Sequence, residues 1–194
     1  MKRTLALFAL LALLSLAGCG HSSRPWGLPD ITGHMPDLKF TLTDDNGQQV
    51  NQAAFAGKVD LLYFGYTHCP DVCPTTLADL GKVLRQLGPA AAQVRVLFVS
   101  VDPARDTPAV LKSYVNAFGP WFVGLSGSQA QLQALTKRYR VAYRLGKPDA
   151  QGNYTVYHSS AVFIFDRQGK ARLLTDLDDK PDVIATDLKR LLQE

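Results

Sequence analysis

Two cysteines four positions apart give this sequence its strongest chemical signal. Cys69 and Cys73 lie in the segment YTHCPDVCP, residues 66–74. At this spacing both sulfur atoms can point into one volume, where soft thiolates suit Cu(I) and an added neutral imidazole also allows Cu(II). A structural disulfide and a redox-active dithiol stay open as alternatives on this evidence.

The chain around the cysteines predicts the elements that position them. Residues 59–66 are apolar enough for a buried strand, and residues 75–87 have apolar side chains at helical spacing up to a stop at Gly88-Pro89. The cysteines therefore fall at the sheet edge where α/β proteins bind ligands. Because Cys73 lies next to the helix start, we expect the helix dipole to favour its thiolate form.

Turn signals and apolar periodicity predict the remaining elements. The Asp-Asn-Gly triplet at 45–47 marks a hairpin turn, and Asp106 before Thr107-Pro108 is expected to cap a helix. In chain order the expected elements are a hairpin over 38–51, strands over 59–66, 94–101 and 121–125 alternating with helices over 75–87, 107–118 and 128–139, strands over 141–145 and 154–157, a hairpin of strands 161–165 and 171–174, and a helix over 183–192.

A β-hairpin followed by β-α-β-α-β-α and then ββα is typical of an α/β domain with helices on both faces of the sheet. We expect a thioredoxin-like fold: a central mixed sheet flanked by helices, with an N-terminal β-hairpin. In such domains the loop before the strand at 161–165 faces the cysteines and usually carries a cis-proline. Here no proline occurs between Pro148 and Pro181, and His158 lies in that neighbourhood.

Of the four histidines in the chain, His158 is therefore the candidate third ligand. His21 and His34 precede the expected first strand, and His68 directly precedes Cys69, where neighbouring side chains point apart. Thioredoxin-type redox motifs have two residues between their cysteines. This chain has three, which favours metal binding over dithiol redox chemistry without excluding the latter.

The N-terminus has the parts of a bacterial secretory signal. Lys2 and Arg3 precede an apolar run over 5–16, which is shorter than the about 20 residues that cross a bilayer. The segment LAGC at 16–19 resembles the lipobox, in which the cysteine is lipidated and begins the mature protein. We therefore expect Cys19 to be lipidated and the protein to lie on the periplasmic side of a bacterial membrane, anchored by lipid.

Length and charge fit one domain that does not bind nucleic acid. Removal of residues 1–18 would leave 176 of the 194 residues and lower the formal charge from +4 to +2, because Lys2 and Arg3 are lost. The other basic residues form no block typical of nucleic-acid binding. We expect a lipoprotein signal peptide over 1–18, the lipidated cysteine with a flexible tether over 19–35, and a thioredoxin-like copper-binding domain over 36–194.

Three sequence blocks occur in a fixed order: CPDVCP at 69–74, VDPARDTP at 101–108 and YTVYHS at 154–159. Together they resemble the Sco/SenC family of copper proteins, and the resemblance extends from about residue 36 to the end. It implies that Cys69, Cys73 and His158 bind one copper ion, as Cu(I) or Cu(II). It also implies a role in assembling the binuclear copper centre of cytochrome c oxidase.

One departure from the family is Tyr157, because the family usually has Asp directly before the histidine. Loss of that carboxylate bears on the orientation of His158 and on partner recognition.

Two functions from different classes follow from the resemblance. The first is a metallochaperone that hands copper to the copper-accepting subunit of cytochrome c oxidase by ligand exchange. The second is a thiol–disulfide oxidoreductase that reduces the cysteines of that subunit and needs Cys69 and Cys73 but not His158. A structural lipoprotein with a plain disulfide is a third interpretation. We favour the chaperone, with another periplasmic copper chaperone or a thiol reductant as further partners.

Overall fold

The computed structural model describes residues 25–150, 154–176 and 178–194, so the expected signal peptide and Cys19 lie outside the described residues. Over the described ranges the elements are β1 (Thr41–Asp44), β2 (Gln49–Asn51), η1 (Gln52–Phe55), β3 (Val59–Gly65), α2 (Val72–Gln86), η2 (Gly88–Gln93), β4 (Val94–Ser100), α3 (Pro108–Asn116), β5 (Phe122–Ser126), α4 (Gln129–Arg138), β6 (Tyr143–Leu145), β7 (Val156–His158), β8 (Val162–Phe165), β9 (Ala171–Thr175) and α5 (Pro181–Leu191). No helix in these ranges is long and apolar enough to cross a membrane.

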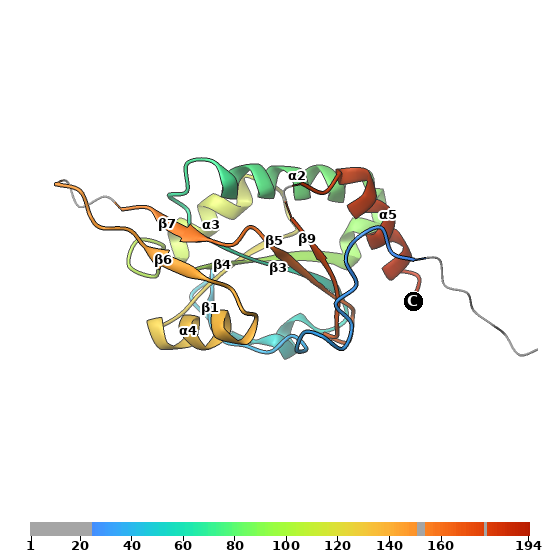
Figure 1. Ribbon diagram of the computed structural model, residues 1–194, viewed down its shortest axis with the longest axis horizontal. Helices are drawn as coiled ribbons and strands as arrows, with labels where there is room; N and C mark the ends of the chain where they lie inside the picture. Colours follow the sequence, from blue (N-terminus) through green and yellow to red (C-terminus); the bar gives the residue numbers. More distant parts are fainter. Residues whose placement is uncertain (1–24, 151–153, 177) are drawn as a thin grey trace, which may run out of the picture.

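A mixed sheet of seven strands forms the centre of the fold (Figure 1). Its order is β2-β1-β5-β4-β3-β8-β9, in which β5, β4 and β3 are parallel, and the adjacent strand of each flanking hairpin, β1 or β8, is antiparallel to them. The expected thioredoxin-like α/β fold with an N-terminal hairpin is confirmed. Strands β6 and β7 form a separate antiparallel pair, which projects from one end of the molecule.

Aromatic side chains of β3 show how the helices cover the two faces of the sheet. Tyr63 packs on Phe98 of β4, which packs in turn on Tyr114 of α3, with ring centroids 6.0 and 5.5 Å apart. The next residue, Phe64, points to the opposite face and packs on Tyr139, at the end of α4. Every residue of β3 is buried, as expected of a strand that is covered on both faces.

Two differences at helix starts from the sequence-based expectation bear on the metal centre. Helix α3 is capped by Thr107, whose hydroxyl accepts from the N–H of Val110, so the expected cap at Asp106 was wrong. The carboxylate of Asp106 is instead turned inward and accepts hydrogen bonds from Thr67. Helix α2 begins at residue 72, three residues earlier than expected, which places Cys73 inside its first turn.

Residues 25–31, here called the N-terminal strap, pack along β9 and α5. The N–H of Leu28 donates to the carboxylate of Asp187 at 2.8 Å, and the carbonyl of Pro29 accepts from the N–H of Leu174 at 3.0 Å. Part of the segment expected as a tether thus contacts the domain. The strap covers the outer edge of β9, at the end of the molecule opposite the β6–β7 hairpin (Figure 1).

Candidate metal centre

The first two candidate ligands come from the β3–α2 connection. Cys69 is partly exposed in this loop, whereas Cys73 is completely buried. The N–H of Cys73 donates to Sγ of Cys69 at 3.3 Å, and the two thiols are not bonded to each other. Gly65, the last residue of β3, permits this packing, because a Cβ there would lie 2.8 Å from Sγ of Cys73.

The third candidate ligand, His158, ends strand β7 and reaches Cys73 from the other side. Its Nε2 lies 3.1 Å from Sγ of Cys73, and its Nδ1 lies 2.9 Å from the carbonyl oxygen of Ser159. Because a carbonyl can only accept, Nδ1 carries the proton and Nε2 presents its lone pair to the cysteines. Tyr63 and Tyr66 contact the imidazole at steep interplanar angles and hold its orientation.

The donor atoms of Cys69, Cys73 and His158 all lie within 4.8 Å of one another. A metal bonded at about 2.3 Å to sulfur and about 2.0 Å to nitrogen, as zinc is, can therefore be reached by all three with little movement. Two thiolates and one imidazole form a soft donor set, which matches Cu(I) and also accommodates Cu(II). The residues present fit a copper ion.

Burial shifts the pKa values of Cys73 and His158, and for Cys73 the shift is opposite to the one expected from its position at the helix start. Burial raises the pKa of the Cys73 thiol to about 12 from an ordinary value of 9.0, although a backbone hydrogen bond from Tyr66 opposes this effect. The expected thiolate at the helix start was therefore wrong for the metal-free protein. Burial also lowers the pKa of His158, against the opposing hydrogen bond to Ser159. The imidazole is thus neutral at pH 7 and ready to bind a metal.

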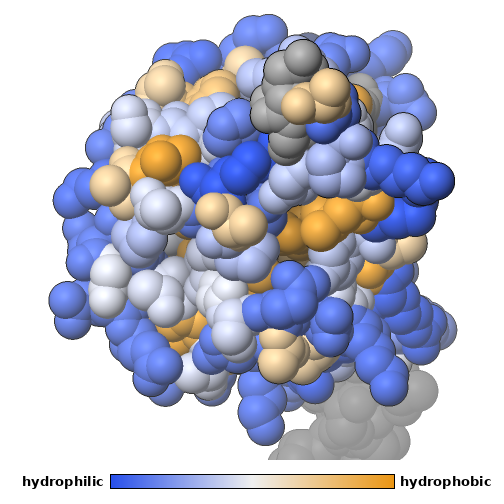
Figure 2. Space-filling model, turned by 90° about the vertical axis from the view of Figure 1, so that its left-hand side faces the viewer, coloured by the Kyte–Doolittle hydropathy of each residue, from blue (hydrophilic) through white to orange (hydrophobic). Residues whose placement is uncertain are grey.

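The centre opens to solvent between the cysteine loop and β7. Residues 69–72 line one side of a groove there and residues 155–158 the other, so Cys69 can be approached from outside. Figure 2 views this end of the molecule and shows an apolar strip enclosed by hydrophilic side chains. Tyr157 is 56% exposed and has the guanidinium of Arg144 over its ring at 4.5 Å. The residue that departs from the family pattern therefore lies on the rim of the groove.

Among the described residues, His34, His68 and Asp71 are not part of the converging cluster. His68 is exposed, contacts the hydroxyl of Thr67 and lies 3.6 Å from Asp106, outside the converging group, as expected of a side chain that points away from its neighbour Cys69. His34 lies in the chain before β1. Asp71 lines the groove without capping α2 through its side chain. His21 lies outside the described residues.

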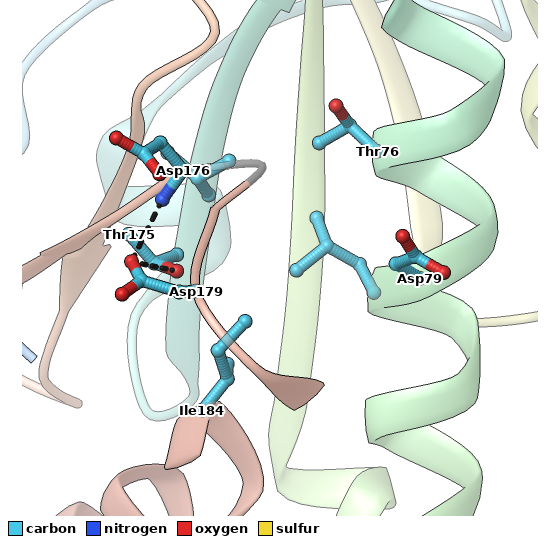
Figure 3. A pocket seen from close by; sticks show the side chains of 8 residues that line it. Thr76, Asp79, Thr175, Asp176, Asp179 and Ile184 are labelled. Atoms are coloured by element: carbon cyan, nitrogen blue, oxygen red, sulfur yellow. Dashed lines mark hydrogen bonds between the residues drawn. The ribbon is translucent and has the colours of Figure 1, made fainter. Parts of the chain in front are cut away.

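A second hollow, between α2 and the β9–α5 connection, offers carboxylates but no comparable ligand set (Figure 3). Asp179 is occupied within its own turn, because it accepts from the hydroxyl of Thr175 at 2.9 Å and from the N–H of Asp176 at 3.1 Å. Within the described ranges, Cys69, Cys73 and His158 form the only group of three or more His, Cys, Asp or Glu residues whose ligand atoms converge.

Fold and site together define a class: a thioredoxin-like protein in which a histidine faces a cysteine pair to form a Cys2His metal-binding constellation. The comparison with known families then assigns the chain within this class. A family model described as SCO1/SenC matches residues 33–193. The chain belongs to the SCO1/SenC family.

Individual relatives agree with this assignment. The SCO2-like protein of Rickettsia felis is 38% identical over 151 residues, which cover 77% of this chain and 74% of the relative. The structure of Bradyrhizobium japonicum ScoI with copper bound has 42% identity and a TM-score of 0.73, covering 80% of this chain and 98% of that one. Yeast Sco1 with copper bound has 30% identity and a TM-score of 0.73, with coverage of 82% and 90%.

Proposed function

We propose that this protein is a membrane-tethered copper chaperone that binds one copper ion through Cys69, Cys73 and His158 and assists assembly of the binuclear copper centre of cytochrome c oxidase. The convergence of these three donor groups within 4.8 Å carries the proposal. Two related structures hold copper, which supports copper as the metal of this site. Copper is here the cargo, and the copper-accepting subunit of the oxidase is the proposed partner.

The geometry suggests how the cargo could leave. Cys69 and His158 line opposite sides of the groove and Cys69 is partly exposed, whereas Cys73 is completely buried. A thiol of the acceptor that enters the groove can therefore replace Cys69 first, while Cys73 and His158 still hold the ion. This order gives ligand exchange a path that never releases free copper.

The membrane tether belongs to the proposal as well. The segment LAGC at 16–19 supports lipidation of Cys19 and a place on the periplasmic side of a bacterial membrane. The domain would then follow from residue 36, with the N-terminal strap already packed against it.

A second candidate function is thiol–disulfide exchange, which the free, unbonded Cys69 and Cys73 favour. In that reaction the two thiols would be oxidised to one disulfide while a disulfide of the acceptor is reduced to two thiols. Attack by Cys69 on the acceptor disulfide is consistent with its exposure, and Cys73 would resolve the mixed disulfide. His158 takes no part in this exchange.

Copper titration of the reduced protein, with and without His158→Ala, separates the two functions. We expect one copper per chain and a thiolate-to-copper absorption band with Cu(II). We expect His158→Ala to change this band and to weaken Cu(I) binding. Loss of a residue that only supports a metal ligand weakens binding about 10- to 100-fold, so loss of a ligand itself should cost at least as much. Retention of rapid disulfide exchange, with no stable copper in the unchanged protein, would favour the oxidoreductase instead.

The acidity of Cys73 predicts a pH dependence of copper affinity. Burial raises the pKa of this thiol to about 12, so the thiol carries its proton between pH 7 and 9 in the metal-free protein, and binding must release that proton. Affinity for Cu(I) should therefore rise at least about tenfold per pH unit between pH 7 and 9. Competition titrations with a chelator of known pH dependence measure this slope. An affinity that stays constant over the range would show that Cys73 is already ionised.

A further inference from the structure

The loop that connects β4 to α3, residues 101–107, contains two buried carboxylates. Asp102 and Asp106 are each 1% exposed. Buried carboxylates are rarely found without partners that satisfy them. Here the partners come from the two different segments that carry the candidate metal ligands.

Asp106 holds the cysteine loop. It accepts from the N–H of Thr67 at 2.9 Å and from the hydroxyl of Thr67 at 2.6 Å, and Ser100 donates a third hydrogen bond from the end of β4. Thr67 precedes Cys69 by two residues, and the N–H of Cys69 donates back to the carbonyl of Tyr66. The carboxylate thus fixes the backbone from which Cys69 projects.

Asp102 holds the histidine hairpin. The hydroxyl of Tyr154 donates to it at 2.6 Å, and the guanidinium of Arg105 forms an ion pair with it. The same guanidinium lies over the ring of Tyr154 at 3.7 Å. Tyr154 is four residues before His158 and directly precedes the pairing of β7 with β6. The link therefore acts on the strand that carries the imidazole.

We propose that Asp102 and Asp106 are positioning residues of the metal centre, with one loop bracing the strand of His158 and the loop of Cys69 at a fixed separation. The inference rests on the proposed function for its copper readout. A role limited to capping α3 does not account for these contacts, because Thr107 caps that helix. Neither carboxylate belongs to the converging ligand set, so each acts through a neighbour.

A double-mutant cycle tests each link without placing a new charge in the interior. Tyr154→Phe removes the hydroxyl that reaches Asp102 but keeps the ring under Arg105. Thr67→Val removes the hydroxyl that reaches Asp106. Each variant is expected to weaken Cu(I) binding about tenfold. In a His158→Ala background, Tyr154→Phe should lower Cu(I) affinity by less than about twofold, because its effect passes through the histidine. Thr67→Val should still lower Cu(I) affinity about tenfold in that background.

Amide hydrogen exchange of the metal-free protein gives a readout that does not depend on copper. Tyr154→Phe should speed exchange of the Gly146 amide, which donates to the carbonyl of Thr155 across the hairpin, and leave the Cys69 amide unchanged. Thr67→Val should do the reverse. Asp37→Asn, which breaks an exposed ion pair with Lys170, is the matched control and should change neither.

The outcomes are distinguishable. If the unchanged protein binds no copper, the proposed function fails while the exchange result still decides the positioning role. The inference would be overturned if Tyr154→Phe lowered Cu(I) affinity equally with and without His158. It would also be overturned if neither Tyr154→Phe nor Thr67→Val changed amide hydrogen exchange, even with copper binding intact.

Discussion

Replacement of Cys73 by alanine is expected to lower affinity for Cu(I) by about 100- to 1,000-fold, because one ligand of a four-ligand zinc site worth about 10–16 kcal/mol contributes roughly 2.5–4 kcal/mol. Cys73 is the ligand that His158 directly faces, at 3.1 Å, and no other thiol of the described residues can replace it. Competition titration with a chromophoric Cu(I) chelator measures the change. Retention of one tightly bound copper by the variant would place the site elsewhere.

The same substitution must be shown to leave the fold intact, because the side chain of Cys73 is completely buried. The sulfur is small, so we expect a loss of about 1 kcal/mol in stability, near the typical cost of one point mutation. Thr75→Ala, an exposed position in the same turn of α2, is the matched control and should retain copper. Thermal unfolding of the three metal-free proteins provides the comparison.

Replacement of Arg95 by methionine is expected to destabilise the fold by about 3–5 kcal/mol at pH 7.5, as is typical when one partner of a buried ion pair is removed. Asp60 is 2% exposed, and Nε of Arg95 donates to it at 2.9 Å. Arg95 also contacts the carbonyl and ring of Phe55. Without the guanidinium, the carboxyl of Asp60 stays buried without its cationic partner, at the strand ends remote from the metal centre.

The loss of folding stability caused by replacing Arg95 should be smaller at acidic pH. Burial raises the pKa of Asp60 to about 6 from 3.8, because desolvation outweighs the attraction of Arg95. The folded protein therefore binds this proton more tightly than the unfolded chain, and protonation stabilises the fold as pH falls from about 6 towards 4. At pH 5 the carboxyl is mostly neutral, so removing Arg95 costs less.

Chemical denaturation at pH 7.5 and pH 5 measures both losses. The double variant Asp60→Asn with Arg95→Met is the control, because it leaves no buried charge and should recover much of the stability at pH 7.5. Copper affinity should be unchanged in all of them. A single variant as stable as the unchanged protein at pH 7.5 would show that the pair contributes nothing.

The sheet was predictable because its central strands are mostly apolar and have few competing interpretations. Residues 59–65 and 94–100 became β3 and β4 within one residue of the expected ends. Strands β6 and β7 were also located, but their separation from the main sheet was not, since short polar strands carry no signal for their partner. The start of α2 was misplaced because Pro74 fits within a first turn.

The convergence of the three candidate ligands was predictable, whereas the residues that support them were not. The cysteine spacing, the histidine before β8 and the family resemblance identified Cys69, Cys73 and His158 as candidates. The supporting hydroxyls of Thr67 and Tyr154 gave no signal, because single polar residues far apart in sequence meet only through the fold. The prediction that Cys73 favours the thiolate form was wrong for a related reason. The sequence shows its position at the helix start but not its depth of burial, which raises the pKa of the thiol.

The N-terminal strap has a consequence for where the protein can work. It ties the start of the described chain to β9 and α5, at the end of the molecule opposite the β6–β7 hairpin (Figure 1). With a lipid anchor at Cys19, the domain would be attached to the bilayer at this end. The proposed copper site would then lie on the side of the domain away from the lipid, and we expect an acceptor to present its own metal site above the lipid surface.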